Sequence, residues 1–220
     1  MPYVITLSGS PADRSRSTHM LNTAEALLGE RGIAVRRIDI RKLPAAALMV
    51  ADTSNVQLRE ALEVVEHAQA VIIATPLYKS AYSGLLKIFL DALPQAALAQ
   101  KPVLPLATGG SLAHLLALDY ALKPVLASLG AQHVLSNVFA TEQDVVWRDD
   151  RYVLAEPIAA RLAEAIDAFV QVLEDAAELR RFRSNALVGP RPFRRTHARQ
   201  SEQLVGQGSV GVFIQPETTY

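Results

Sequence analysis

The serine-rich segment from Gly9 to Ser17 holds the first residues that could do chemistry. It follows a short β-rich run and leads into a helical pattern, so its backbone N–H groups would lie at a helix N-terminus. Such N–H groups and the positive end of the helix dipole favour a phosphate, and hydroxyls and a guanidinium would add hydrogen bonds and charge. The candidate phosphate ligands are Ser10, Ser15, Arg16 and Ser17, with Arg14 as an alternative source of charge.

This segment matches neither of two common phosphate-binding motifs. It lacks the Gly-Lys-Ser/Thr ending of a P-loop, and it lacks the dinucleotide pattern Gly-x-Gly-x-x-Gly. Serine is also a favoured N-cap residue, so a capping loop without a ligand is an alternative interpretation. The place of the loop after the first strand of an α/β pattern favours phosphate binding.

The elements around this loop alternate between strand and helix five times, which predicts one α/β domain with a mostly parallel sheet between two helical layers. Five strands favour a flavodoxin-like, three-layer, doubly wound sheet in the order 2-1-3-4-5. Segment 44–54 is expected to be a loop, and 182–220 a basic tail outside the domain 1–181. The predicted strands are 3–7, 33–40, 70–74, 103–107 and 132–139, and the predicted helices are 15–31, 56–67, 84–93, 111–129 and 157–181.

Two further polar loops would meet the phosphate loop at one edge of this sheet. Residues 75–84 follow the third predicted strand, and residues 108–111 follow the fourth. Ligands of open parallel sheets bind beyond the carboxyl ends of the strands, at the point where the strand order reverses. The sequence therefore predicts a single site built from three loops.

Composition excludes several classes of function. The 220 residues include no cysteine, so disulfides, thiolate metal sites and a cysteine nucleophile are ruled out, and redox chemistry would need a bound cofactor. The formal net charge of zero argues against nucleic acid and membrane surfaces as partners. No metal-ligand cluster and no catalytic triad is evident. With no signal peptide or long apolar run, we expect a cytoplasmic protein.

Three motifs give this sequence a specific resemblance. Gly9-Ser10-Pro11, the stretch 74–87 and the stretch 104–124 resemble the NAD(P)H-dependent FMN reductases, which are flavodoxin-like proteins. Within that family, the reductases of two-component alkanesulfonate monooxygenase systems are the most similar. The resemblance covers roughly residues 3–175 and fails in the tail. Motifs of this length are far more specific than a lone glycine pattern.

The resemblance implies a role for each loop. It places the FMN phosphate on the serine-rich loop and the flavin ring between the other two, where backbone N–H groups can bond the ring without side-chain bulk. Ordinary packing of Tyr78 and a solvated charge at Lys79 are the alternatives at those positions. The implied ring-side residues are Pro76, Leu77, Tyr78, Lys79, Thr108, Gly109 and Gly110, with Ser83 near the open face and a dimer contact.

The predicted helix 111–129 contains a proline that disturbs it. Pro124 has no N–H to bond the carbonyl of Tyr120, and its ring clashes there. A π-bulge at Tyr120 or a simple proline kink would absorb this. The resemblance favours the π-bulge, because alkanesulfonate-type reductases have a tyrosine in a π-helix at the matching position, at a tetramer interface that affects flavin binding.

The implied function is hydride transfer from NADPH or NADH to FMN, with no side chain required as acid or base. The resemblance further implies a homo-oligomer, a dimer or tetramer, whose FMNH2 leaves for a monooxygenase, in sulfonate-sulfur assimilation. The alternatives are a quinone or azo-compound reductase with tightly held FMN and a flavodoxin-like electron carrier. Carriers of that kind are usually strongly acidic, and this chain is neutral.

Overall fold

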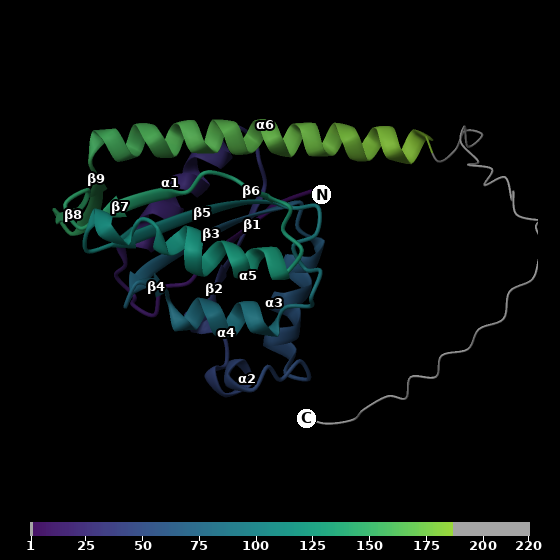
Figure 1. Ribbon diagram of the computed structural model, residues 1–220, viewed down its shortest axis with the longest axis horizontal. Helices are drawn as coiled ribbons and strands as arrows, with labels where there is room; N and C mark the ends of the chain where they lie inside the picture. Colours follow the sequence, from purple (N-terminus) through teal and green to yellow (C-terminus); the bar gives the residue numbers. More distant parts are fainter. Residues whose placement is uncertain (1, 187–220) are drawn as a thin grey trace, which may run out of the picture. The chain divides into compact units, whose positions relative to one another are not determined.

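The computed structural model describes residues 2–186 (Figure 1). Residues 1–181 make one compact unit. The predicted basic tail thus falls almost wholly outside the described residues. Within the described part, no helix combines the length and apolar character that crossing a membrane requires.

A parallel sheet forms the centre of this compact unit. Its strands follow the order β2-β1-β3-β5-β6, and β7 pairs with β5 beyond the end of β6. When only the parallel strands are counted, this order is the predicted flavodoxin-like order 2-1-3-4-5, which is confirmed. The central strands β3 and β5 begin with uninterrupted apolar runs, which suits strands covered on both faces. The sheet strands are β1 (Val4–Ser8), β2 (Val35–Asp39), β3 (Ala70–Tyr78), β5 (Pro102–Gly109), β6 (His133–Val134) and β7 (Val138–Thr141).

The helices cover both faces of this sheet (Figure 1). On one face, Met20 of α1 packs in the same core cluster as Leu162, Ile166 and Phe169 of α6, whose spacing marks one side of a helix. On the other face, α3, α4 and α5 pack over a second cluster. The helices are α1 (Arg16–Glu30), α3 (Val56–His67), α4 (Gly84–Ala92), α5 (Lys123–Ser128) and α6 (Glu156–Ala186).

The strand register aligns the polar ends of the strands. Ser8 at the end of β1 pairs with Ala74, and Pro76 pairs with Thr108. At the next step along the sheet, Gly109 pairs with Thr141. The carboxyl ends of β1, β3, β5 and β7 therefore meet at one edge, as the topology predicts.

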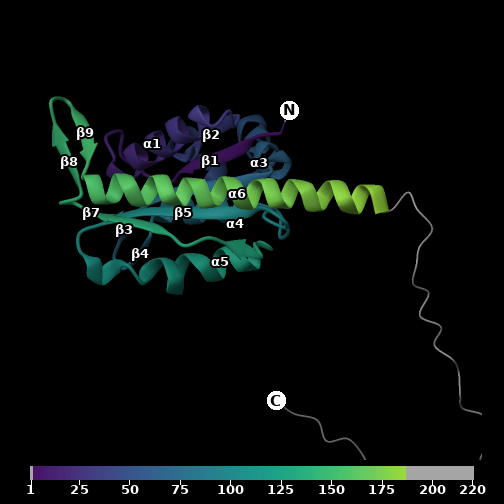
Figure 2. The ribbon, with the colours of Figure 1, turned by 90° about the horizontal axis from the view of Figure 1, so that it is seen from above.

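Besides the predicted helix 111–129, the structure differs from the predicted elements in four segments. The predicted loop 75–84 contains the end of β3 and a short antiparallel strand, β4 (Ala81–Tyr82). The expected loop 44–54 contains a short helix, α2 (Ala45–Met49), after η1 (Ile40–Lys42). The fifth strand, expected to be continuous, is broken into β6 and β7. An unpredicted antiparallel hairpin, β8 (Val145–Arg148) and β9 (Arg151–Leu154), projects at one end of the sheet (Figure 2).

The predicted helix 111–129 is interrupted where Pro124 requires it. After a 3₁₀ turn, η2 (Leu112–His114), the π-helix η3 (Leu118–Leu122) leads into α5. The N–H of Lys123 donates to the Leu118 carbonyl, which is the five-residue spacing of a π-helix. The predicted π-bulge at Tyr120 is confirmed, and the Tyr120 side chain is 79% exposed.

Candidate functional site

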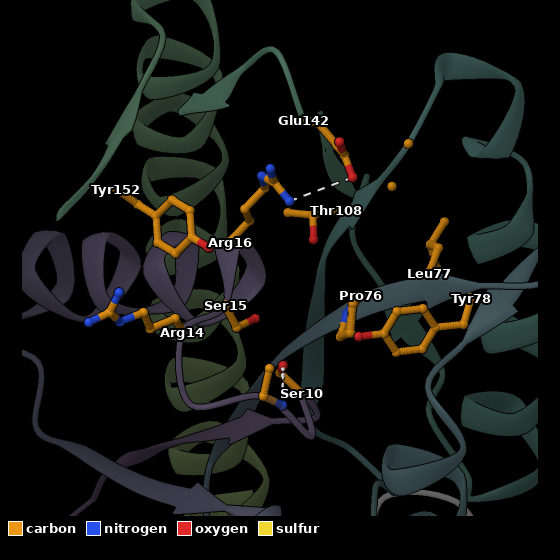
Figure 3. Close-up of a pocket in the computed structure, with 13 residues that line it drawn as sticks. Ser10, Arg14, Ser15, Arg16, Pro76, Leu77, Tyr78, Thr108, Glu142 and Tyr152 are labelled. Atoms are coloured by element: carbon orange, nitrogen blue, oxygen red, sulfur yellow. Dashed lines mark hydrogen bonds and ion pairs between the residues drawn. The ribbon is translucent and has the colours of Figure 1, made fainter. Parts of the chain in front are cut away.

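A pocket of about 140 Å³ lies at the carboxyl edge of the sheet, where the three predicted loops meet (Figure 3). Its fourth side comes from the chain after β7, through Glu142 and Tyr152. The structure therefore brings together loops separated by up to about a hundred residues of sequence. The predicted site residues that line the pocket are Ser10, Ser15, Arg16, Pro76, Leu77, Tyr78, Thr108, Gly109 and Gly110.

The serine-rich loop forms a capped helix N-terminus. Ser15 is the N-cap of α1, and its Oγ accepts a hydrogen bond from the Thr18 N–H at 3.3 Å. The helix offers no partner to the N–H groups of Arg16 and Ser17, which precede Thr18 in the first turn. Ser15 Oγ also lies 2.9 Å from Ser17 Oγ, and buried Ser10 Oγ accepts from the Ala12 N–H at 3.2 Å. Hydroxyls and first-turn N–H groups are thus gathered on one side of the pocket.

Two arginines bring positive charge to this loop. The Nε of Arg16 donates to the Val145 carbonyl at 3.1 Å, and its Nη1 lies 3.6 Å from a Glu142 carboxylate oxygen. The guanidinium of Arg14 lies over the Trp147 ring, 4.9 Å from its centroid. Both arginine side chains are therefore held by the segment that contains the β8–β9 hairpin.

The ends of β3 and β5 form the opposite side of the pocket from the serine-rich loop (Figure 3). Leu77 is buried, whereas Tyr78 is half exposed beside it. A Cβ at Gly109 would lie 3.0 Å from a carbon of the Phe139 ring, so only glycine fits there without a shift. Gly110 faces open space. This side thus combines the apolar side chains of Pro76 and Leu77 with Tyr78 and Thr108, and its backbone is approachable at Gly110.

Four predicted site residues do not line the pocket. Ser17 is buried behind Ser15, and Lys79 is exposed in the β3–β4 turn. Ser83 caps α4, and its buried hydroxyl donates to the Gly9 carbonyl. Tyr120 points to solvent from η3.

Sequence reasoning missed Glu142 and Tyr152. Glu142 is the sole carboxylate lining the pocket in the part of the chain that the structure describes. The available signal was that Glu142 follows the fifth strand, just as the three predicted loops follow theirs. Tyr152 lies on the unpredicted hairpin, with its ring 5.9 Å from the Arg16 guanidinium carbon.

The pocket fits a phosphorylated flat heterocycle such as FMN. One end offers hydroxyls, first-turn helix N–H groups and two arginines, which suit a phosphate. The other end offers an apolar surface from Pro76 to Tyr78 and the open backbone at Gly110. Together, the parallel sheet and this two-part pocket define a flavodoxin-like α/β protein with a nucleotide-type site.

Comparison with known proteins identifies the family within this class of flavodoxin-like proteins. The family model described as NADPH-dependent FMN reductase matches residues 2–145. The FMN reductase (NADPH) of Escherichia coli K12 is 44% identical over 170 residues, which are 77% of this chain and 89% of that protein. The FMN reductase (NADPH) of Pseudomonas putida KT2440 is 40% identical over 168 residues, 76% of this chain and 85% of that protein. The chain belongs to the NADPH-dependent FMN reductase family.

A solved structure agrees with this assignment. The apo form of the NADH:FMN oxidoreductase EMOB superposes with a TM-score of 0.70 at 41% identity, covering 77% of this chain and 88% of that one. The protein is thus an NAD(P)H:FMN oxidoreductase, and its cofactors are FMN and NADPH or NADH.

Proposed function

We propose that this FMN reductase binds FMN in the pocket at the sheet edge and releases the reduced flavin to a separate monooxygenase that uses it in sulfonate-sulfur assimilation. The observation that supports this binding site is that the pocket has two different ends. Residues 10–16 provide groups that suit a phosphate, and residues 76–78 provide apolar side chains that suit a ring. The resemblance of stretches 74–87 and 104–124 to alkanesulfonate-type reductases supports the partner and the pathway.

The residues of the pocket have distinct tasks in this proposal. Ser10, Ser15 and Arg16 hold the phosphate, with the first-turn N–H groups of α1. The segment from Pro76 to Tyr78 covers the ring from one side, and Thr108 to Gly110 support it from the other. Bound FMN supplies the hydride acceptor for the nicotinamide. The chain's own contribution is to orient the ring and exclude water, which requires no acid or base side chain.

The free-flavin part of the proposal has a direct test. Flavin-free protein should oxidise NADPH at a rate that rises with added FMN and saturates, and the FMNH2 formed should sustain an added flavin-dependent monooxygenase. A rate independent of added FMN, with yellow flavin retained through gel filtration, would instead assign a tightly bound cofactor. That result would contradict the proposed release of reduced flavin to a monooxygenase.

The oligomer is a second part of the proposal. The π-helix exposes Tyr120, and Leu115 and Leu116 before it are also exposed. Exposed apolar side chains gathered on one segment are typical of an interface between subunits. We propose that this segment joins copies of the chain in a homo-oligomer and that Tyr120 influences flavin retention there. Tyr120→Ala should shift the sedimentation distribution to smaller species or alter the FMN dissociation constant; wild-type values for both would remove Tyr120 from the interface.

A further inference from the structure

Glu142 occupies an unexpected place for an acid. It lines the pocket beside the loop that carries the phosphate-binding groups, where a negative charge opposes a phosphate. Its carboxylate faces Arg16, the same side chain that the proposed function assigns to the phosphate (Figure 3).

The fold holds the Glu142 backbone in this position. β7 ends at Thr141, whose register partner is Gly109 of the pocket. A tight turn follows, in which one Asp144 carboxylate oxygen accepts hydrogen bonds from the Thr141 N–H and hydroxyl, both at 2.7 Å. The Asp144 N–H donates back to the Thr141 carbonyl at 3.2 Å. Glu142 lies inside this turn, so the same sheet edge that presents the glycines also presents its side chain.

The Arg16–Glu142 ion pair has one anchored partner and one exposed partner, so it can separate. The guanidinium is anchored through its Nε, which donates to the Val145 carbonyl at 3.1 Å. The Nη1-to-carboxylate distance of 3.6 Å is an ion-pair contact, too long for a good hydrogen bond. The Glu142 side chain is 62% exposed, against 36% for Arg16. The cation is therefore fixed, while the carboxylate can move into solvent and leave the Nη donors to another anion.

We propose that Glu142 competes with the FMN phosphate for Arg16, and that this competition weakens FMN binding so that the flavin exchanges readily. This inference rests on the proposed phosphate site. A bound phosphate must displace the carboxylate from Arg16 and remain near its negative charge. Because solvent screens an exposed pair, the effect should be moderate. A residue of this kind sets the flavin affinity without contacting the ring.

The experiment measures dissociation constants for FMN and riboflavin by flavin fluorescence, without NAD(P)H, at neutral pH and low salt. Glu142→Gln keeps the shape and removes the charge. It should tighten FMN binding by about 3- to 10-fold, in line with a moderately screened charge pair. Riboflavin, which lacks the phosphate, should bind within about twofold of wild type.

Glu63→Gln is the matched control. Glu63 forms a similarly exposed ion pair on α3, 3.8 Å from Arg59, and its side chain does not line the pocket. This variant removes the same charge from the protein and should bind both flavins as wild type does.

The outcomes separate this inference from the proposed function. FMN affinity that is unchanged or lower in Glu142→Gln, while wild type still prefers FMN to riboflavin, would overturn only the role of Glu142. Equal tightening of riboflavin would also overturn it, since the effect would then lie at the ring. Wild-type protein that binds both flavins equally would overturn the phosphate site itself and the inference with it.

Discussion

Two walls of the pocket are built in different ways. The sheet wall, at the ends of β1, β3 and β5, is tied together by buried hydrogen bonds. The Gly9 N–H donates to the Ala74 carbonyl at 2.8 Å, and the Ser83 N–H donates to Thr75 Oγ1 at 3.0 Å. The hairpin wall, residues 142–154, faces the sheet wall. It is held by contacts of aromatic rings: an edge-on pair of Trp147 and Tyr152, and two arginine side chains that lie over these rings.

This difference predicts that the sheet wall contributes mainly to stability and the hairpin wall mainly to ligand affinity. Buried hydrogen bonds are costly to lose because an unpaired polar group stays behind, whereas exposed charge and ring contacts contribute little each. We therefore expect changes in the sheet wall to reduce the free energy of unfolding. Changes in the hairpin wall should mainly alter ligand affinity. Variants of the two walls test that division, and the largest effect is expected at Ser83.

Ser83→Ala should be the most damaging of these changes. The Ser83 hydroxyl donates to the Gly9 carbonyl and accepts from the Leu86 N–H at 3.1 Å, so it both caps α4 and links it to the phosphate loop. Losing a cap and leaving a buried carbonyl unpaired should lower the free energy of unfolding by about 2–4 kcal/mol, measured by urea denaturation.

Ser128→Ala is the control for that variant. Its exposed hydroxyl donates to the Val125 carbonyl at 2.8 Å within α5. Water can replace this bond, so the loss should stay below about 0.5 kcal/mol. Equal losses in the two variants would contradict the special role of the sheet wall.

Gly109→Ala should have the next largest effect. The new Cβ would lie 3.0 and 3.1 Å from two carbons of the Phe139 ring, so either the ring or the end of β5 must move. Overpacking of this kind should cost about 1–2 kcal/mol of unfolding free energy. Gly110→Ala meets open space and should leave the thermal midpoint nearly unchanged. A larger loss at Gly110 than at Gly109 would reverse the assignment of the two glycines.

The two walls also differ in how far sequence could predict them. The sheet wall follows from apolar runs that end in Gly, Ser, Thr and Pro, because parallel strands must deliver their ends to one edge. These features depend on short-range chemistry and on topology that five alternations already imply. Pro124 in a helical pattern predicted only a disturbance at Tyr120, and the family resemblance favoured the π-helix that the structure has over a simple proline kink.

The hairpin wall depends on contacts that no local pattern reveals. The β8–β9 turn places Asp149 and Asp150 at positive φ, 48° and 57°, without the Asn-Gly or Asp-Gly pair that usually signals such a turn. One turn next to the sheet wall shares this feature: Lys79 and Ser80, between β3 and β4, have φ values of 50° and 61°. The pairing of Arg16 with Glu142 spans well over a hundred residues, so residue types alone did not place it.

Trp147→Ala tests the hairpin wall directly. Trp147 packs edge-on against Tyr152 at 4.9 Å between centroids, and Arg14 lies over its ring. Because the side chain is partly exposed, its loss should cost about 1 kcal/mol of unfolding free energy, less than Ser83→Ala. Trp147→Phe keeps an aromatic ring and should therefore retain most of the unfolding free energy that Trp147→Ala loses. A loss from Trp147→Ala above that of Ser83→Ala would place the hairpin among the main supports of the fold.

The smallest expected effect is a pH dependence that links helix α1 to the hairpin wall. Burial, and then the positive charge of Arg151 on β9, lower the pKa of His19 on α1 below its ordinary value of 6.5. The folded protein therefore binds fewer protons at His19 than the unfolded chain does, so with respect to this group the stability is highest above pH 6.5. It declines as the pH falls from 6.5 through the folded pKa, by a slope of less than about one proton. His19→Gln should flatten this part of the urea-measured stability profile, and Arg151→Ala should shrink it by raising the folded pKa towards 6.5. A profile that Arg151→Ala leaves unchanged would show that the hairpin charge does not reach His19, and burial alone would then account for the lowered pKa.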